Sequence, residues 1–489
     1  MGTDQRAAGR SADHGGGGVM LLAHAFGQRY ELPIPLLVFV LGGGAVVLVS
    51  FALIATRSVR QAEEASFADI AHTKPANKIG GTISTVVLVA LVICGLRGSQ
   101  VVAENILPTL FWLITWIAVP LSVGLLGDWT GPVNPFAFLA RAADRPGVRK
   151  VVLGSAQPVS WPAWLAWWPA VLLFFIAACG ELVFNLTATV PANTAWALAV
   201  YALLNLFMGL LFGFRWLERG EMFTVLYSTW GRLGFFRFGS PGRRGFAGGL
   251  TVPFQGTPSR ITFVLLLLVN VNFDGLLATP RWIAFERRLP GALAAHPHRL
   301  EAFRTATFIL LALSLAVLFS IFAFAAVRIG QRRTGFLQGL TGLLPSLLPI
   351  AFAYLFAHNV EYLVVNSQLL LPLIGNPAGV DWWPVLPFPF NDSYEVHPHL
   401  VPNAVYWYVS VTVIVVAHIV AVLLAHRHLG ARQPDPRTAR ASEYPWLAIM
   451  VAYTMLSLWL LAQPLVTEHP AGPQATSVTP ALGPAGVPR

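Results

Sequence analysis

The chain has 489 residues, of which 55% are hydrophobic and only 11% are charged. Soluble domains are about a quarter charged, so this composition excludes an ordinary soluble fold and predicts a membrane protein. The net charge of +10 comes from basic residues in the connections between apolar stretches. No basic run interleaved with aromatic residues stands out from the background of basic loops, so the charge does not indicate nucleic-acid binding.

Ten apolar stretches follow one another along the chain, each about as long as a helix needs to be to cross ~30 Å of hydrocarbon. They cover residues 35–56, 81–96, 108–126, 164–184, 193–214, 261–278, 305–327, 342–365, 405–426 and 445–465. Continuous apolarity without alternation predicts helices rather than strands. The expected fold class is therefore all-α, a polytopic transmembrane helical bundle of about ten spans that forms one domain over residues 31–466.

The segments outside the bundle are polar or low in complexity. Residues 1–30 form a glycine-rich tail and residues 467–489 a Pro/Ala/Gly-rich tail, and both are expected to be disordered. Lys and Arg gather in the loops that follow odd-numbered spans. This bias predicts a multi-pass plasma-membrane protein with both termini on the extracytoplasmic side. The exception is the arginine-rich loop after the sixth span. If the sixth span were re-entrant, the membrane orientation of every later span would be reversed.

The eighth span carries ionisable residues within an apolar stretch. At about 100° per residue, Tyr354, His358, Glu361, Val365 and Gln368 are expected to share one face. Burying His and Glu in hydrocarbon is costly, so such residues usually face the bundle interior and mark a functional site. The alternative interpretation is a hydrogen-bonded cluster that fixes helix packing.

Two other spans end in carboxylates. Asn270 and Asp274 lie one turn apart in the sixth span, and Glu181 ends the fourth. The predicted topology places these groups in the outer half of the membrane with His358 and Glu361. Asp274 is expected either to join an outward-opening pocket or to lie at the interface, and Glu181 to be solvated at the interface. We expect His358 to reach Asp274 or His418, and Glu361 to open toward the same cavity.

Histidines suggest metal binding as a second chemistry. His358 and His418 are on consecutive spans and could share a divalent metal such as Zn²⁺ or Cu²⁺, or a haem, with Asp274 as a further metal ligand. His397 and His399 form a His-Pro-His unit in an outward loop, and His24 is also predicted to lie outside. These three are secondary candidates for a metal site, and plain solvated histidines are the alternative.

Helix-breaking residues favour a different function. Pro345 and Pro349 are expected to interrupt the eighth helix, and Asn270 with Asp274 the sixth. Discontinuous helices are typical of transporters, whose ion and substrate sites lie at such breaks.

Several short motifs in a fixed order resemble one family. They are the segment 24–33 (HAFGQRYELP), Gly127-Asp128 with Asn134-Pro135, segment 273–276 (FDGL), Ala357-His358 through Gln368 with Asn376-Pro377, and Ala417-His418 with Ala425-His426. Together they resemble bacterial, largely actinobacterial, multipass membrane proteins labelled fenitrothion hydrolase, over roughly residues 22–465. The resemblance implies a membrane-bound organophosphate hydrolase, without a catalytic assignment to carry over. Family members often place the first His after an export leader, whereas a glycine-rich tail precedes His24 here.

Three functions are therefore compatible with the sequence. The first is a metal-dependent hydrolase of apolar esters, with His358, His418 and Asp274 as metal ligands and Glu361 as general base, Asp274 also being a candidate catalytic residue. The second is a proton- or cation-coupled transporter of a small ionic substrate, which uses the same residues without turnover. The third is a structural or assembly subunit that binds a membrane-protein partner.

Overall fold

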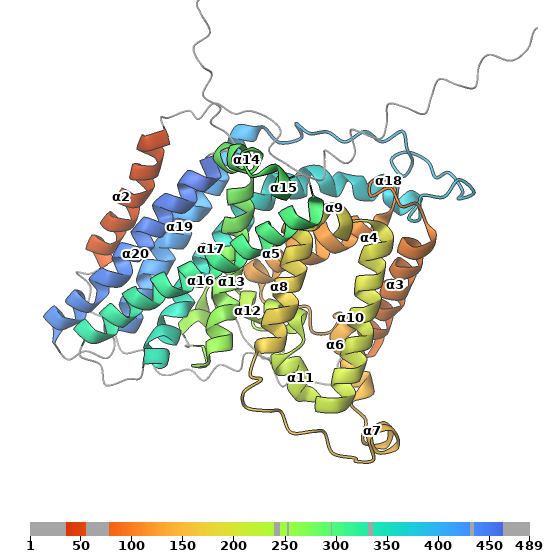
Figure 1. The fold of residues 1–489 in the computed structure, drawn as a ribbon, viewed down its shortest axis with the longest axis horizontal. Helices are drawn as coiled ribbons and strands as arrows, with labels where there is room; N and C mark the ends of the chain where they lie inside the picture. The colour runs from red at the N-terminus through yellow and green to blue at the C-terminus, as the bar shows by residue number, and fades with distance from the viewer. Residues whose placement is uncertain are drawn as a thin grey trace, which may run out of the picture.

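The structure is a computed structural model, in which residues 36–54, 78–238, 245–251, 254–294, 296–330, 336–430 and 435–462 are described. The predicted tails, residues 1–30 and 467–489, lie outside the described residues. Within the described ranges the chain forms helices, turns and loops, and no β-strand. The all-α fold class is confirmed (Figure 1).

Every predicted span corresponds to a helix or a continuous helical run. These are α2 (Leu36–Ile54), α3 (Lys78–Arg97), the run α4 (Ile106–Pro108), η1 (Thr109–Ala118) and α5 (Val119–Leu126), α8 (Trp168–Leu182), α10 (Pro191–Phe212), α13 (Pro258–Leu277), α16 (Pro297–Ile329), α17 (Phe336–Asn366), α19 (Asn403–Gly430) and α20 (Pro436–Ala462). Among the described residues, 8 helices are long and apolar enough to cross a membrane. The two others are α8, with only 15 residues, and α20, whose first turns are charged.

Short helices lie at the two ends of the bundle. They are α6 (Pro135–Ala143), α7 (Pro146–Leu153), α9 (Asn185–Ala188), α11 (Phe214–Arg219), α12 (Met222–Trp230), η2 (Gly248–Thr251), α14 (Pro280–Arg287), α15 (Gly291–Ala294), η3 (Ser367–Leu369) and α18 (Leu370–Gly375). We call the end formed by residues 98–105, 183–190, 278–294 and 367–402 the cavity face. The opposite end, formed by residues 127–167, 213–238, 245–251 and 254–257, is the basic face.

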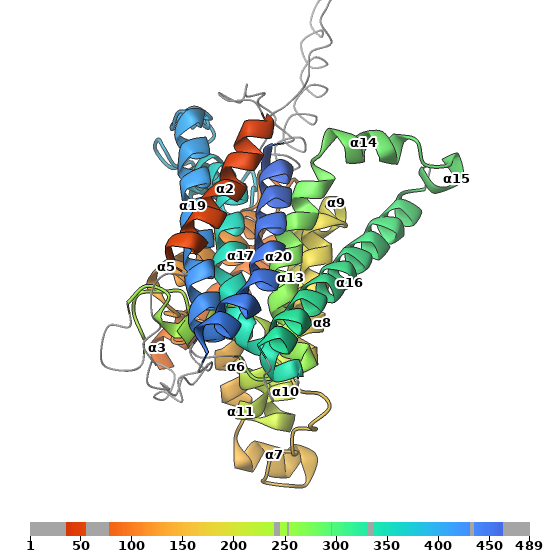
Figure 2. The ribbon, with the colours of Figure 1, turned by 90° about the vertical axis from the view of Figure 1, so that its left-hand side faces the viewer.

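Hydrogen bonds between loops show that each face is continuous. On the cavity face, the backbone N–H of Ser99 donates to Ala378 O and that of Ile106 to Pro377 O. On the basic face, Trp167 N–H donates to Ser259 Oγ. Helix α13 runs from the basic face to the cavity face beside α17 and α20 (Figure 2). The sixth span is therefore not re-entrant.

The centre of the bundle is formed by α17 and α13, whose residues are mostly buried by the surrounding helices. Both helices are continuous: Pro345 and Pro349 lie inside α17, and Asn270 and Asp274 lie inside α13. The predicted interruption of these two spans is wrong. Proline is tolerated within a transmembrane helix where neighbouring groups satisfy the backbone, and α17 lies in such a packed environment.

The third span contains the least common helix type. Residues Thr109–Ala118 form a π-helix, in which Val119 N–H donates to Ile114 O, five residues earlier. Pro108 precedes this stretch and Pro120 follows it, and neither has an N–H to donate. π-helical turns are rare and are frequent at functional sites. This one separates the two cavities described below.

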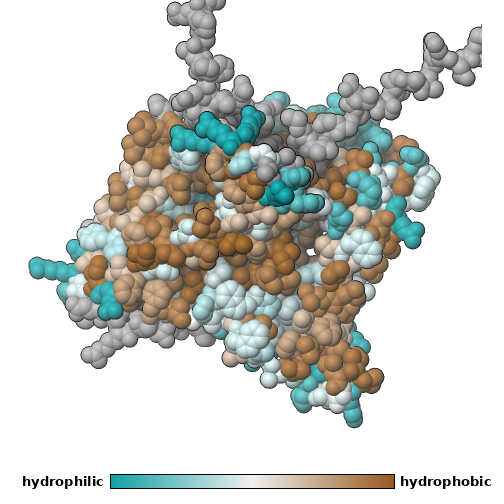
Figure 3. Space-filling model, in the orientation of Figure 1, coloured by the Kyte–Doolittle hydropathy of each residue, from teal (hydrophilic) through white to brown (hydrophobic). Residues whose placement is uncertain are grey.

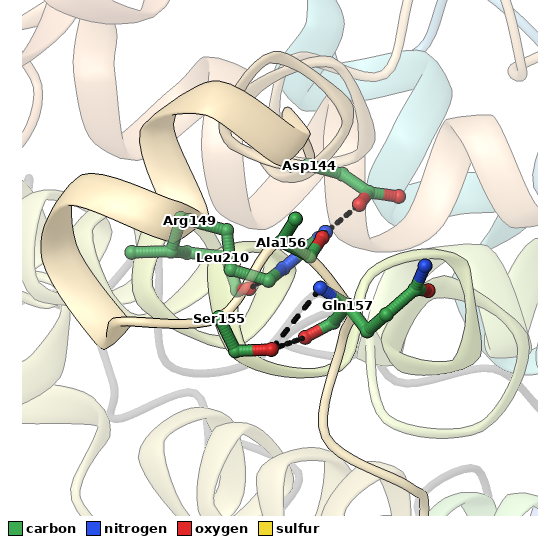
Figure 4. A network of polar contacts seen from close by, with 6 residues as sticks. All are labelled: Asp144, Arg149, Ser155, Ala156, Gln157 and Leu210. Carbon is green, nitrogen blue, oxygen red and sulfur yellow. Dashed lines mark hydrogen bonds and ion pairs between the residues drawn. The ribbon is translucent and has the colours of Figure 1, made fainter.

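A buried arginine fixes the connection between α6 and α7 to α10 on the basic face (Figure 4). Arg149 Nε donates to Leu210 O at 2.7 Å, its Nη1 donates to Ala156 O at 3.0 Å, and its Nη2 pairs with Asp144. Only 2% of the Arg149 side chain is exposed. The guanidinium thus satisfies one of the last carbonyls of α10 and holds the loop against the bundle.

The surface agrees with a membrane environment. Apolar residues cover much of the face seen in Figure 3, over α2, α16 and α10. On α16 they follow helical spacing, with Leu310, Leu313, Val317 and Ile321 all more than half exposed. Such a stripe would be unfavourable in water and is expected in contact with lipid. The chain is a multipass membrane protein in contact with a lipid bilayer.

Candidate functional site

A cavity of about 410 Å³ lies at the cavity face, between η1 and helices α8, α13, α14, α16 and α17. Its polar lining residues come from all six of these elements and from α9 with the residue that follows it, although they are far apart in sequence. They are Thr109, Glu181, Asn185, Thr189, Asp274, Glu286, Arg304, His358, Asn359, Tyr362 and Asn366. The cavity therefore gathers most of the ionisable residues that the spans carry toward this face.

An ion pair between α17 and α13 forms part of the cavity wall. His358 Nε2 lies 2.6 Å from Asp274 Oδ2. The imidazole is nearly buried, with 12% of the side chain exposed, whereas 35% of the Asp274 side chain is exposed. The prediction that His358 faces the interior and reaches Asp274 is confirmed. The physical reason is that neither lipid nor the helix backbone can satisfy an imidazole at this depth.

Glu181 adds a second carboxylate to the pair. It lines the same cavity from α8 and is close enough to Asp274 and His358 for their charges to interact. Among the described residues, no group donates a hydrogen bond to its buried Oε2. The structure places Glu181, which is partly buried, in the wall of this cavity.

The rim of the cavity contains a separate, fully formed ion pair. Arg304 Nε and Nη2 donate to the two carboxylate oxygens of Glu286, each at 2.7 Å. Trp282 Nε1 donates to Glu286 Oε1 at 2.8 Å, and Thr279 Oγ1 caps α14. The rim pair is bidentate and neutralises itself. Sequence reasoning missed it, since the loop between the sixth and seventh spans was considered only for its arginines.

The face of α17 that borders the cavity differs from the predicted stripe. His358, Asn359, Tyr362, Asn366 and Leu369 line it, while Glu361 does not. Around the helix axis, Glu361 lies about 60° from His358, on the side away from Tyr362. On that side its charge interacts with Tyr406 of α19.

Gln368 also points elsewhere. Its side chain donates to His397 O at 3.1 Å and accepts from His397 N–H at 2.9 Å, which fixes the loop 376–402. The prediction that Glu361 opens into the cavity is wrong. Gln368 stabilises the loop 376–402 through its hydrogen bonds to the His397 backbone.

His418 lies in a different layer of the bundle. It is fully buried, its Nδ1 donates to Ile414 O at 2.8 Å, and its ring meets Tyr354 edge-on at 6.3 Å between centroids. His418 does not line the cavity. The proposed sharing of a metal or haem by His358 and His418 therefore has no geometric support, because the two imidazoles belong to separate environments.

The predicted metal site depends on the histidines and on Asp274. Among the described residues, no group of three or more His, Cys, Asp or Glu side chains that could hold a metal ion is found. His397 and His399 are exposed on the loop 376–402 and form no such group, and His24 lies outside the described residues. No step of a mechanism is therefore assigned to Zn²⁺ or Cu²⁺.

Comparison with family models gives no match to this chain, and no curated protein and no solved structure matches it significantly.

Proposed function

We propose that the protein moves protons or a small cation across the membrane, and that Asp274, His358 and Glu181 form the ion-binding site. One observation carries the proposal: two carboxylates and one imidazole from three helices meet at a cavity in the membrane-spanning bundle. Intramembrane ionisable residues that pair around a cavity are typical of ion pathways and proton relays. The distribution of Lys and Arg supports a cavity that opens to the outside.

The charges in the cavity favour a cation over an anion. Arg304 is occupied by both oxygens of Glu286, so it does not offset the other carboxylates. Asp274 and Glu181 then face a single imidazole. With both carboxylates ionised, the site is two charges negative when the imidazole is neutral and one charge negative when the imidazole is protonated. It can take up a proton at the imidazole or at the Glu181 carboxylate, or it can bind a small cation between Asp274 and Glu181.

Flux in proteoliposomes tests this function directly. Purified protein is reconstituted with a trapped pH-sensitive dye, a potassium gradient and valinomycin, and sodium uptake is measured in parallel. We expect wild-type protein to carry protons or sodium, and D274N and H358Q to lower the flux at least tenfold. The matched control is E395Q, which alters an exposed carboxylate of the loop 376–402. Absence of both fluxes in correctly folded wild-type protein would overturn the proposal.

A second candidate is hydrolysis of an apolar ester, and the Asp274–His358 pair favours it over a purely structural role. A carboxylate that holds an imidazole can orient it as a general base toward water in the cavity. Water would then attack the ester phosphorus, its proton would pass to the imidazole, and the alkoxide or aryloxide would leave. The resemblance to fenitrothion hydrolases supports this class of substrate. Release of nitrophenolate from a dialkyl nitrophenyl phosphate triester, lost in H358Q, distinguishes hydrolysis from transport.

A further inference from the structure

A second cavity, of about 480 Å³, lies between α3 on one side and η1, α5 and residues 129–136 on the other. Its walls are mainly apolar. Helix α3 contributes Ile83, Val87 and Leu91, and η1 contributes Leu110 and Phe111. Ile83 and Val87 are 59% and 47% exposed, so the cavity opens sideways between helices rather than only at an end of the bundle. We call it the lateral groove.

The polar groups that border the lateral groove are bonded within the protein. Ser84 Oγ donates to Gly81 O and Thr115 Oγ1 to Leu110 O. Trp129 Nε1 donates to Ser122 Oγ, and Asn134 Nδ2 donates to Glu221. An occupant therefore meets apolar surface along the walls, which suits a hydrocarbon chain and not a polar solute.

The depth of the groove matches one leaflet of a bilayer. It follows α3 from Gly80 to Leu91, about 16 Å at 1.5 Å per residue, and a bilayer core is about 30 Å thick. At the basic face it is closed by the contact between α3 and α6, where a Cβ at Gly81 would lie 2.2 Å from Phe138 Cδ2. The groove thus begins where a lipid headgroup would sit and extends toward the bilayer centre.

Positive charge is found at this headgroup end. Lys78 is exposed and begins α3, two residues before Gly80. Arg141 Nη1 donates to Gly131 O at 3.4 Å, beside the residues that form the rim. The nearby carboxylate of Glu221 is fully buried, and that of Asp144 is paired with Arg149. Basic residues at the end of an interhelical pocket are a recognised feature of anionic-lipid sites.

We propose that the lateral groove is a binding site for one acyl chain of an anionic phospholipid, whose phosphate is held by Lys78 and Arg141. This site is separate from the ion site and does not depend on it. Lipid binding here would hold α3 and η1 in a fixed arrangement, because the chain would fill the space between them.

Native mass spectrometry of protein released from nanodiscs tests the site. Wild-type protein in phosphatidylglycerol discs is expected to retain one lipid that survives activation, and to retain several-fold less in phosphatidylcholine discs. V87W fills the groove and should lower retention at least threefold. V86W is its matched control, since Val86 is the adjacent exposed residue of α3 and does not line the groove. The double variant K78Q/R141Q should remove the preference for phosphatidylglycerol.

Two results would overturn the proposal. Equal retention in V87W and V86W would identify the retained lipid as general annular lipid. A change of oligomeric state in V87W, without a loss of lipid, would identify the groove as a contact between protein chains. S84F, a second variant in the groove wall, is measured beside V87W, with thermal unfolding of every variant to separate filling of the groove from misfolding.

Discussion

Glu221 and Glu181 are both carboxylates of the bundle, one at each face, and their surroundings are opposite. Glu221 is fully buried and accepts from Phe223 N, Thr224 N, Thr224 Oγ1, Tyr201 OH and Asn134 Nδ2. Glu181 has one buried oxygen to which no described group donates, and it faces a cavity. A carboxylate with all its acceptor positions used serves structure, whereas one left open beside a cavity is available to a ligand.

The strongest test of this contrast is removal of the Glu221 carboxylate. E221A deletes the side-chain cap of α12 and leaves buried donors, including Tyr201 OH and Asn134 Nδ2, without an acceptor. We expect a loss of about 3–5 kcal/mol in the free energy of unfolding, because uncompensated buried polar groups are costly. Thermal unfolding in detergent measures it. E218Q, which alters a partly exposed carboxylate paired with Arg215, should change little. Equal stability of E221A and wild type would contradict the structural role.

The rim pair should give an intermediate effect. Glu286 and Arg304 are partly buried, with 14% and 28% of their side chains exposed, and are joined by two hydrogen bonds. A double-mutant cycle with E286Q and R304Q should give a coupling free energy of about 1–2 kcal/mol, above that of a typical surface pair. The same variants report on function, because this pair fixes α14 at the rim. A coupling near zero would show that the pair contributes nothing to holding that helix.

The sequence predicted the helices and their order, because long apolar stretches specify membrane spans with little ambiguity. It also predicted that His358 would reach Asp274 or His418, since a buried imidazole requires a polar partner, and the structure shows the contact with Asp274. It failed where a small rotation decides the outcome: Glu361 and Tyr362 differ by one position, and only packing against η1 and α13 selects Tyr362 for the cavity. The roles of Glu181 and Glu286 depend on short helices α9 and α14, which have no strong sequence signal.

Asp128 receives fewer donors than Glu221, and it should show a smaller, pH-dependent effect. It accepts from Thr130 N–H and Thr130 Oγ1, and burial raises the pKa of its carboxyl above the usual range. A raised pKa in the folded state stabilises the fold most below the unfolded pKa, and this contribution is lost as the pH rises through the folded pKa. The stability of wild type relative to D128N should therefore fall as the pH rises above about 4, the ordinary pKa of an aspartate carboxyl. A difference that is flat with pH would contradict this.

Substitution of Glu181 should have the smallest effect on stability and a large effect on function. E181Q removes a charge from a buried oxygen that receives no hydrogen bond from the described residues, and it removes repulsion with Asp274. The unfolding temperature should stay the same or rise, because the repulsion with Asp274 is removed and a neutral amide costs less to bury than a carboxylate. Ion flux should fall, because the site then has one carboxylate instead of two. A stability loss as large as that of E221A, with flux preserved, would show that Glu181 is a structural carboxylate and would reverse the comparison. The functional half of the prediction thus separates an ion site from a packing cluster, since only an ion site loses activity while its fold is preserved.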